Sequence, residues 1–457
     1  MHLKSAAPKP PKLMPWDRLP AGKTPIGVID PCYGSSRVIY GLPTPHHAHV
    51  TLPRLPLRRL DRDSTFFEFT PLVLDARVPL LHTWNMIPVN GDFLMSFELE
   101  IPRYLRQPAD WQVRFGLDRL SSPRCKGLLA LSEFARRHAL RVFQAHGYEH
   151  LADKLDVFRG GVWDPFAKGL PPPSGQPGNG RDRPLTAIVI GTQLFRKGGM
   201  YSIEAFERLR AQGLDVRLTL VGDFESRCYA FREGIPDREA WRRRAASHDW
   251  ITMMPPVPFA QVFQLLLSHD VCLYPSLDES LGWLPIEAAM AGRPVIGARI
   301  AAFPEFVQHD KTGWLIDIDL DASERWVGLR LQGEAHRQAL AEVRERMVSG
   351  IEAAMRRLAD SPDTGPTWGA AGRLAMQSMY DMEQAGADLE WHVQPLSLEK
   401  FGDPLHPFPA FTASVCNLRP TSRGHVRLAS TDHALAPDRK STRLNSSHSQ
   451  QSRMPSS

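Results

Sequence analysis

Short apolar runs separated by polar or helical stretches recur along most of this chain. In its first part they are PIGVID, PLVLDA, PLLHTW, FLMSFELE and KGLLALS, then the helical SEFARRHALRVFQAHG, then KLDVFRGGV. Apolar strands that alternate with helical stretches predict a parallel sheet joined by crossover connections. We therefore expect residues 25–168 to form a Rossmann-like domain.

The same alternation is stronger after residue 184. The runs TAIVIG, VRLTLVG, VCLYPS and PVIGARI alternate with the amphipathic stretches GMYSIEAFERLRAQG, FAQVFQLLLSHD and PIEAAMAG, and residues 322–360 and 371–386 also have a helical pattern. Continuous apolar strands indicate a sheet that is buried on both faces. Residues 185–365 are therefore predicted to form a second doubly wound α/β domain.

The remaining segments lack this periodicity. Residues 1–24 predict a flexible amino-terminal segment, and GLPPPSGQPGNGRDRP at 169–184 predicts a linker because Pro and Gly support neither strand nor helix. A carboxyl-terminal helix at 366–392 is expected to cross back to the first domain. Residues 393–457 predict a disordered tail, and 439–457 resemble a translated sequencing adapter, the alternative being a natural Ser-rich tail.

Charge and cysteine usage narrow the possible partners. The whole net charge of +5 comes from residues 419–457, whereas the preceding residues hold equal numbers of acidic and basic side chains. A balanced body predicts no nucleic-acid partner. Five cysteines without a CxxC pair indicate reduced thiols, and neither a signal peptide nor a membrane span is visible. We expect a cytoplasmic protein, with peripheral membrane contact left open.

The first candidate for chemistry is the turn from Gly191 to Gly199, between an apolar strand and a helix. Ligands of open α/β sheets bind beyond the carboxyl ends of the strands, where helix amino termini offer free N–H groups. Arg196 and Lys197 add positive charge suited to a diphosphate. The alternative is an ordinary turn with exposed basic residues.

The second candidate is the stretch from Pro275 to Glu287, which also follows an apolar strand. Pro285 suits the first turn of a helix, so the amides of residues 280–282 would be available to an anion. Glu279 and Glu287 are suited to accepting hydrogen bonds from sugar hydroxyls. For Glu287 alone, a solvated helix surface is the competing interpretation.

Together these stretches resemble the donor-binding domain of the family 4 glycosyltransferases, which are retaining enzymes of the GT-B fold. The matching residues, which span about 130 positions, are Gly191, Lys197-Gly198, Val221-Gly222, Pro275-Ser276, Glu279 and Glu287, the run EAAMAGRPV at 287–295, Pro304-Glu305 and Thr312-Gly313-Trp314. Weaker likeness covers ALSEF at 130–134 and FRGGV at 158–162. The resemblance implies two Rossmann-like domains facing each other across a cleft.

The resemblance also implies an activity and roles for residues. The chain would transfer a sugar, with retention, from a nucleotide-diphosphate sugar to a carbohydrate or lipid-linked acceptor, in glycan, polysaccharide or glycolipid biosynthesis, without a metal or other cofactor. Lys197 would pair with the diphosphate, Glu287 with the ribose and Glu279 with the transferred sugar. The amides near Ser280, Leu281 and Gly282 would hold phosphate and sugar oxygens. A non-catalytic nucleotide-sugar-binding protein of the same fold is the alternative.

Two positions depart from the family pattern. Thr192 stands where the family usually has Arg. The second cation that binds the diphosphate is therefore expected to be Arg196. Thr192 and Gly222 complete the predicted donor-binding residues. The family's amino-terminal His is replaced in Met95-Ser96-Phe97-Glu98. Glu98 is the candidate for its sugar or acceptor contact, and a shifted alignment is the alternative.

Two other patterns could indicate metal sites. The histidines at 46, 47 and 49 lie in a Pro-rich stretch without a Cys partner, which favours an exposed loop. Asp317-Ile318-Asp319 imitates the metal motif of GT-A enzymes, but its place after TGWLI favours a structural loop. His82, in LLHTWN, could border the cleft or cap a strand.

Overall fold

The computed structural model describes residues 19–57, 65–74, 78–104, 108–167, 169–171, 182–382 and 385, and four strands further along the chain. One unit runs up to Gly386 and a second begins at Ala387. The predicted flexible segment up to residue 18, most of the predicted linker (172–181) and residues 443–457 lie outside the described residues. Within the described part of the chain, no helix is long and apolar enough to cross a membrane.

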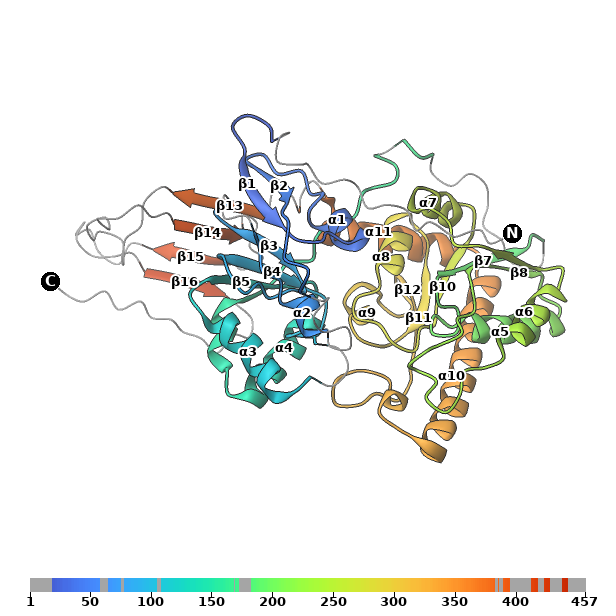
Figure 1. The fold of residues 1–457 in the computed structure, drawn as a ribbon. Coiled ribbons are helices and arrows are strands. Elements are labelled where there is room, and N and C mark those ends of the chain that lie inside the picture. Colours follow the sequence, from blue (N-terminus) through green and yellow to red (C-terminus); the bar gives the residue numbers. More distant parts are fainter. Residues whose placement is uncertain are drawn as a thin grey trace, which may run out of the picture. The chain divides into compact units, whose positions relative to one another are not determined.

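A six-stranded parallel sheet occupies the first part of the chain, in the order β2-β1-β3-β4-β5-β6 (Figure 1). Its strands are β1 (Thr24–Val28), β2 (His47–Thr51), β3 (Leu81–Trp84), β4 (Phe93–Phe97), β5 (Cys125–Ala130) and β6 (Leu155–Val157). Its helices are α1 (Tyr33–Val38), α2 (Phe66–Phe69), α3 (Asp110–Ser121), α4 (Glu133–His146) and the 3₁₀ helix η3 (Glu149–Lys154).

A second six-stranded parallel sheet follows, in the order β12-β11-β10-β7-β8-β9. Its strands are β7 (Leu185–Gly191), β8 (Val216–Gly222), β9 (Ile251–Met254), β10 (Val271–Tyr274), β11 (Val295–Ala298) and β12 (Gly313–Ile316). Its helices are α5 (Gly199–Ala211), α6 (Arg238–Ala246), α7 (Phe259–Leu267), α8 (Trp283–Met290), α9 (Phe303–Phe306), η4 (Val327–Leu329), α10 (Gly333–Asp360) and α11 (Thr364–Tyr380).

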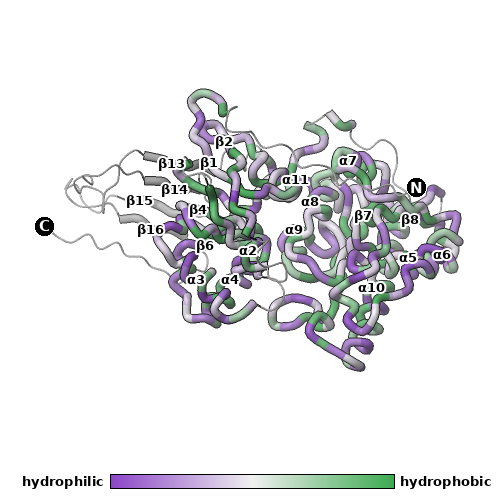
Figure 2. The backbone as a smooth tube through the Cα atoms, in the orientation of Figure 1, coloured by the Kyte–Doolittle hydropathy of each residue, from purple (hydrophilic) through white to green (hydrophobic). Residues whose placement is uncertain are grey.

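Both sheets owe their burial to continuous apolar strands. Ile188 and Val189 in β7 and Leu273 in β10 are fully buried, as are the neighbouring residues of α5. Figure 2 shows hydrophobic residues gathered along the strands, whereas hydrophilic and hydrophobic residues alternate along the helices. Because helices cover both faces, such strands need no polar side, and this is why their sequence alternates so little.

Two expectations for the first sheet were wrong. The run PLVLDA forms only an isolated antiparallel bridge, Val73 to Arg54, in its described residues 71–74, and the Asn90 side-chain amide binds both backbone polar groups of Val73, each at 2.9 Å. Conversely, the histidine-rich stretch expected to be an exposed loop is β2. His47 and His49 point inward, with 5% and 6% of their surface exposed, and histidines conceal the apolar pattern of that strand.

The carboxyl-terminal elements also differ from the expectations. The residues after 322 form a turn and η4 before α10 begins at Gly333. The helix predicted at 366–392 ends at Tyr380, whose carbonyl accepts a hydrogen bond from the Val162 N–H at 2.6 Å. Arg373 of that helix binds Asp164 at 2.6 Å.

Beyond residue 386 the structure describes two antiparallel pairs, where the sequence predicts part of a helix and a disordered tail. β13 (Leu389–Gln394) pairs with β14 (Thr412–Asn417), and β15 (Arg423–Arg427) pairs with β16 (Asp438–Thr442). The sequence LEWHVQ alternates apolar and polar residues with the period of a strand. A strand of six residues is easily overlooked when only the helical period is considered.

Candidate functional site

The two predicted loops lie side by side at the carboxyl ends of the central strands of the second sheet. β7 and β10 are parallel neighbours, and the strand order reverses between them. Connections on the two sides of such a reversal lead to helices on opposite faces, so they separate and leave room for a ligand beyond the strand ends. The loop from Gly191 to Gly198 follows β7, and the loop from Pro275 to Gly282 follows β10.

The backbones of these loops are joined. The Leu277 N–H donates to the Arg196 carbonyl at 2.9 Å. Gly198 has a φ of 80°, and a Cβ there would lie 2.3 Å from the Pro275 carbonyl oxygen. Only Gly allows both this conformation and this approach. The Lys-Gly pair therefore fixes one loop against the other.

Gly222 has a similar steric role at the end of β8. It pairs in register with Gly191, its φ is 133°, and a Cβ would lie 1.7 Å from the Gly191 carbonyl oxygen. Gly222 therefore allows β8 to end closely beside the first loop. The next residue of that loop, Thr192, is exposed.

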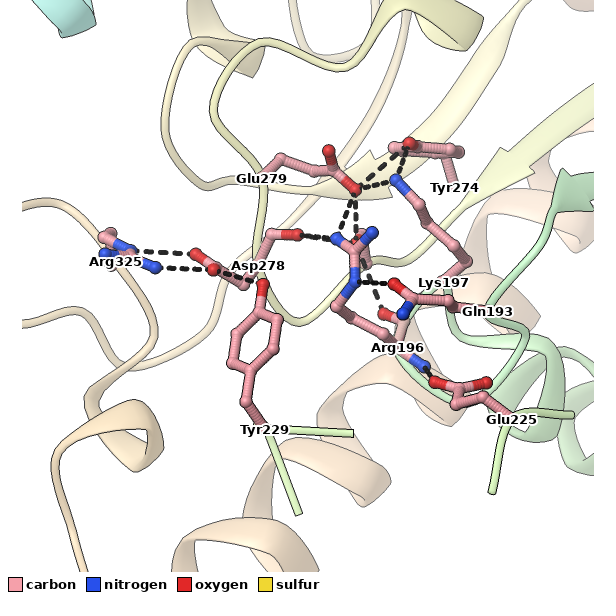
Figure 3. A network of polar contacts seen from close by, with 10 residues as sticks. Gln193, Arg196, Lys197, Glu225, Tyr229, Tyr274, Asp278, Glu279 and Arg325 are labelled. Atoms are coloured by element: carbon pink, nitrogen blue, oxygen red, sulfur yellow. Dashed lines mark hydrogen bonds and ion pairs between the residues drawn. The ribbon is translucent and has the colours of Figure 1, made fainter. Parts of the chain in front are cut away.

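Glu279 stands at the centre of the site (Figure 3). Its carboxylate forms an ion pair with the Lys197 ammonium and accepts a hydrogen bond from the Arg196 guanidinium at 3.0 Å. The hydroxyls of Ser276 and Tyr274 donate to the same oxygen at 2.9 and 3.1 Å. The structure therefore brings together the two cations of the first loop and the acid of the second.

These contacts oppose the effect of burial on the pKa values of the three central groups. Burial alone would raise the pKa of Glu279, but Lys197 and Arg196 outweigh it and the pKa is lowered. Burial lowers the pKa of the Lys197 ammonium, and Glu279 only partly opposes this. For Arg196, burial is outweighed by Glu279 and neighbouring groups, and its pKa is raised. Charged groups inside a protein interact more strongly than they do in water.

A second carboxylate, Asp278, extends this cluster. It is 5% exposed and forms a two-point ion pair with Arg325, at 2.9 and 2.5 Å. The Tyr229 hydroxyl donates to it at 2.7 Å. Arg196, Lys197 and Arg325 thus face Glu279 and Asp278, while Glu100 lies 4.0 Å from Arg325. Lys197 and Arg196 share a single side-chain carboxylate, Glu279, so these two cations are the ones suited to an incoming anion.

Glu225 organises the first loop from the β8 side. Its carboxylate accepts the N–H groups of Phe195 and Arg196 at 2.9 and 3.0 Å. Gln193 accepts from the Arg196 side chain at 2.9 Å. These amides of the first loop are therefore occupied within the protein, and the loop offers its side-chain charge instead.

The predicted amide donors belong to the start of α8. Gly282 is the residue preceding this helix, Leu281 is buried and Ser280 is partly exposed. The first N–H groups of any α-helix have no acceptor within the helix, and they carry partial positive charge. The backbone at 280–283 is thus an arrangement that can receive phosphate or sugar oxygens.

Glu287 lies on α8 and has a partner from the first sheet's α1. It is 3% exposed and forms an ion pair with Arg37 at 2.6 Å. The Arg37 guanidinium also lies over the Phe259 ring, 4.1 Å from its centre. Burial raises the pKa of Glu287, and Arg37 only partly offsets this. The two predicted acids thus have separate cationic partners.

The first sheet places Glu98 directly after β4. Its carboxylate binds Arg103 at 3.0 Å, and its N–H donates to the Asn85 side chain at 3.1 Å. The neighbouring Glu100 lies 4.0 Å from Arg325. Glu98 is therefore at the carboxyl edge of its sheet, with an arginine as its partner.

His82 belongs to a buried network, not to a strand cap. It lies in β3, and its ring nitrogens are 3.3 Å from the His49 ring and 2.8 Å from the Ser96 hydroxyl. Its carbonyl accepts from the Tyr40 hydroxyl at 3.0 Å. Burial lowers the pKa of both histidines, that of His49 to about 4, so both rings are neutral near pH 7.

The two carboxylates of Asp317-Ile318-Asp319, which resemble a metal-binding motif, belong to two separate ion pairs. Asp317 binds Arg299 at 2.5 Å, and Asp319 binds Arg346 at 2.9 Å. No group of three or more His, Cys, Asp or Glu side chains suited to a metal ion occurs among the described residues.

Five residues of the site were not predicted, namely Glu225, Tyr229, Tyr274, Asp278 and Arg325. Tyr274 and Asp278 had a signal, because the first ends a strand and the second precedes Glu279 in the loop. Arg325 had none, because it is in an irregular turn far along the chain.

Two parallel six-stranded sheets, with the candidate site at the strand-order reversal of the second, define the class of this protein. They are the GT-B fold, and this confirms the predicted fold class. Residues 185–325 match the family described as "Glycosyl transferases group 1", which confirms the predicted family resemblance over that segment.

Known proteins with related sequences cover the same part of the chain. A D-inositol 3-phosphate glycosyltransferase of Pseudarthrobacter chlorophenolicus is 30% identical over 114 residues, or 25% of this chain and 26% of that protein. An N-acetyl-alpha-D-glucosaminyl L-malate synthase of Bacillus anthracis is 34% identical over 166 residues, or 35% and 40%. The chain thus spans only about a quarter to two fifths of these relatives' length.

The likeness in fold extends further than the likeness in sequence. A glycosyltransferase structure from Rickettsia africae matches with a TM-score of 0.50 and 16% identity, covering 80% of this chain and 96% of that one. Both sheets are therefore included in the structural match.

Proposed function

We propose that the protein transfers a sugar from a nucleotide-diphosphate sugar to a carbohydrate or lipid-linked acceptor, with retention at the anomeric carbon. One observation carries this proposal: Lys197, Arg196 and Glu279 meet where the order of a Rossmann-like sheet reverses. This site lies inside the segment that matches the group 1 glycosyl transferases.

The charges suit departure of a nucleoside diphosphate. Negative charge builds up on the diphosphate as the glycosidic bond breaks, so cations that are already in place stabilise the transition state more than the ground state. Lys197 and Arg196 supply these cations, and Arg196 compensates for the absence of an arginine at Thr192. The first amides of α8 add further donors for the phosphate and sugar oxygens.

Glu279 has two tasks in this proposal. In the unliganded site it balances the two cations, which reduces the cost of burying them. With donor bound, its carboxylate accepts hydrogen bonds from hydroxyls of the transferred sugar, while the cations turn toward the diphosphate. Its lowered pKa favours the ionised form that this role needs.

Glu287 would hold the ribose hydroxyls. An ionised carboxylate accepts hydroxyl hydrogen bonds on both of its oxygens, and more strongly than the neutral acid does. Arg37 favours the ionised form, partly offsetting the effect of burial, and leaves lone pairs on the other oxygen. We place the acceptor beside the first sheet, where Glu98 is the candidate to contact it.

A transfer assay tests the proposal. The purified chain would be incubated with uridine and guanosine diphosphate sugars and simple glycoside acceptors, and released nucleoside diphosphate and product would be quantified. Coupling constants at the product's anomeric proton report retention or inversion. We expect a retained anomeric configuration. Donor binding without transfer to any acceptor would instead support a non-catalytic nucleotide-sugar-binding protein.

A further inference from the structure

The turn from Asp321 to Arg325 is held rigidly by its own contacts. The Asp321 carboxylate accepts the N–H groups of Ser323 and Arg325 at 2.8 and 3.2 Å and the Ser323 hydroxyl at 2.6 Å. Glu324 adopts a φ of 64°, which is unusual for a residue with a side chain. Such a conformation persists where its surroundings fix it firmly. The turn is therefore suited to holding two side chains at a set angle.

The two adjacent side chains of this turn bind different parts of the molecule. The two carboxylate oxygens of Glu324 accept hydrogen bonds from Nε and Nη2 of Arg137, at 3.1 and 2.7 Å, and one of them also accepts from Arg141 at 3.3 Å. Both arginines belong to α4, next to the first sheet. Arg325 instead binds Asp278 of the donor-side loop. One peptide unit thus connects a helix of the first domain with the loop that holds Glu279.

Asp278 connects Arg325 to Glu279 and to Arg196. Its side chain is fixed by Arg325 and by the Tyr229 hydroxyl, and its carbonyl accepts the Arg196 guanidinium at 2.6 Å (Figure 3). The same guanidinium reaches Glu279. A two-point arginine–carboxylate pair fixes orientation as well as distance. Moving Arg325 would therefore shift both Glu279 and the cation beside it.

We propose that Arg325, acting through Asp278, is a positioning residue for Glu279 and Arg196, and that Glu324 makes this position depend on contact with α4. The inference rests on the proposed function, because it assigns the residues that align the transfer site. Reacting groups must be held to within a few tenths of an ångström, and a displacement of about 1 Å can cost roughly 100-fold in rate. Contact with α4 would then align the acid and cations only when the two domains meet.

Conservative variants test this inference. Arg325→Lys keeps the charge but loses the two-point geometry, and Glu324→Gln weakens the contact with Arg137 and Arg141. The matched control is Glu345→Gln, because Glu345 forms a comparable two-point pair with Arg208 on the exposed side of α10 and α5. The measurements are kcat and KM for whichever nucleotide sugar supports transfer, together with the melting temperature of each variant.

We expect Arg325→Lys and Glu324→Gln to lower kcat by about 10- to 100-fold, with KM for the donor within about 3-fold of the unaltered protein. The double variant should have a kcat similar to that of the more impaired single variant, because both residues act through one turn. Glu345→Gln should retain kcat. If Arg325→Lys does not fold, Glu324→Gln still tests the inference, because the contact that it alters is partly exposed and its loss should leave the fold intact.

The outcomes separate this inference from the function on which it rests. A kcat for Glu324→Gln equal to that of Glu345→Gln, with transfer intact, would overturn the positioning role alone. A loss confined to KM or to the melting temperature would overturn it as well. Absence of transfer by the unaltered protein would overturn both the function and the inference.

Discussion

Lys197 and Glu279 are 82 residues apart in the sequence and form a partly buried ion pair. They come from the loops after β7 and β10, which are neighbours only because the sheet order reverses between them. The pairing therefore depends on the fold and not on local sequence. Under the proposed function, this cation and this acid exchange partners when a donor binds.

Replacing Glu279 by Gln separates binding from transfer. The change removes the negative charge that Lys197 and Arg196 share, so affinity for a nucleoside diphosphate should stay the same or rise. Transfer should fall by about 100-fold or more, the usual cost of removing a polar group that stabilises a transition state. Calorimetric titration with uridine or guanosine diphosphate and the transfer assay measure the two effects. Equal losses in both would contradict the separate roles.

Arg37 should set the pH dependence of donor binding. Burial raises the pKa of Glu287 and Arg37 opposes this, so Arg37→Met should raise that pKa further. Because the ionised carboxylate accepts hydroxyl hydrogen bonds more strongly than the neutral acid does, donor affinity should fall at a higher pH in the variant than in the unaltered protein as acid is added. Titrations across acidic to neutral pH check this, and identical pH profiles would argue against a ribose contact.

The histidine network should make the first domain sensitive to acid. His49 has a pKa of about 4 when folded and about 6.5 when unfolded, so the unfolded state binds protons first. The stability of the neutral network is complete above pH 6.5 and is lost as the pH falls toward 4, by about 3 kcal/mol for His49. Urea unfolding at several pH values measures this. His49→Gln should flatten the dependence, whereas exposed His146→Gln should leave it unchanged.

Glu305 should contribute to stability by joining α9 to α4. Its carboxylate accepts the N–H groups of Glu133 and Phe134 at 2.9 and 2.7 Å, the donors that an α-helix leaves free at its start. Loss of a comparable helix cap costs about 1–2 kcal/mol. Glu305→Ala should therefore lower the free energy of unfolding by that amount, and Glu305→Gln by less. An unchanged value for Glu305→Ala would mean that water replaces the contact without cost.

Transfer should continue in the presence of a chelator. Lys197, Arg196 and the first amides of α8 supply the positive charge that a departing diphosphate needs. Addition of EDTA to the assay, with and without later Mg²⁺, should change kcat by less than about 2-fold. A loss of activity that Mg²⁺ or Mn²⁺ restores would require a metal in the mechanism.

The sequence predicts the second domain well because its apolar strands have one interpretation. TAIVIG and VCLYPS are followed directly by the loops of the site, so Lys197 and Glu279 could be expected to meet at a strand edge. In the first domain the periodicity misleads, because polar His47 and His49 are buried in β2. The long-range contact of Arg325, in contrast to that of Lys197, had no local signal. Arg325 reaches Asp278 across 47 residues, and only the folded backbone brings them together.

The most direct measurement is the affinity of the protein for uridine or guanosine diphosphate before and after Lys197→Met. The side-chain volume is nearly kept, and the exposed Lys311→Met is the control. The account predicts binding by the unaltered protein and by the control, and affinity at least about 10-fold weaker for Lys197→Met, since a charge-assisted contact is worth about 1.5–3 kcal/mol. Equal affinities in all three proteins would contradict it.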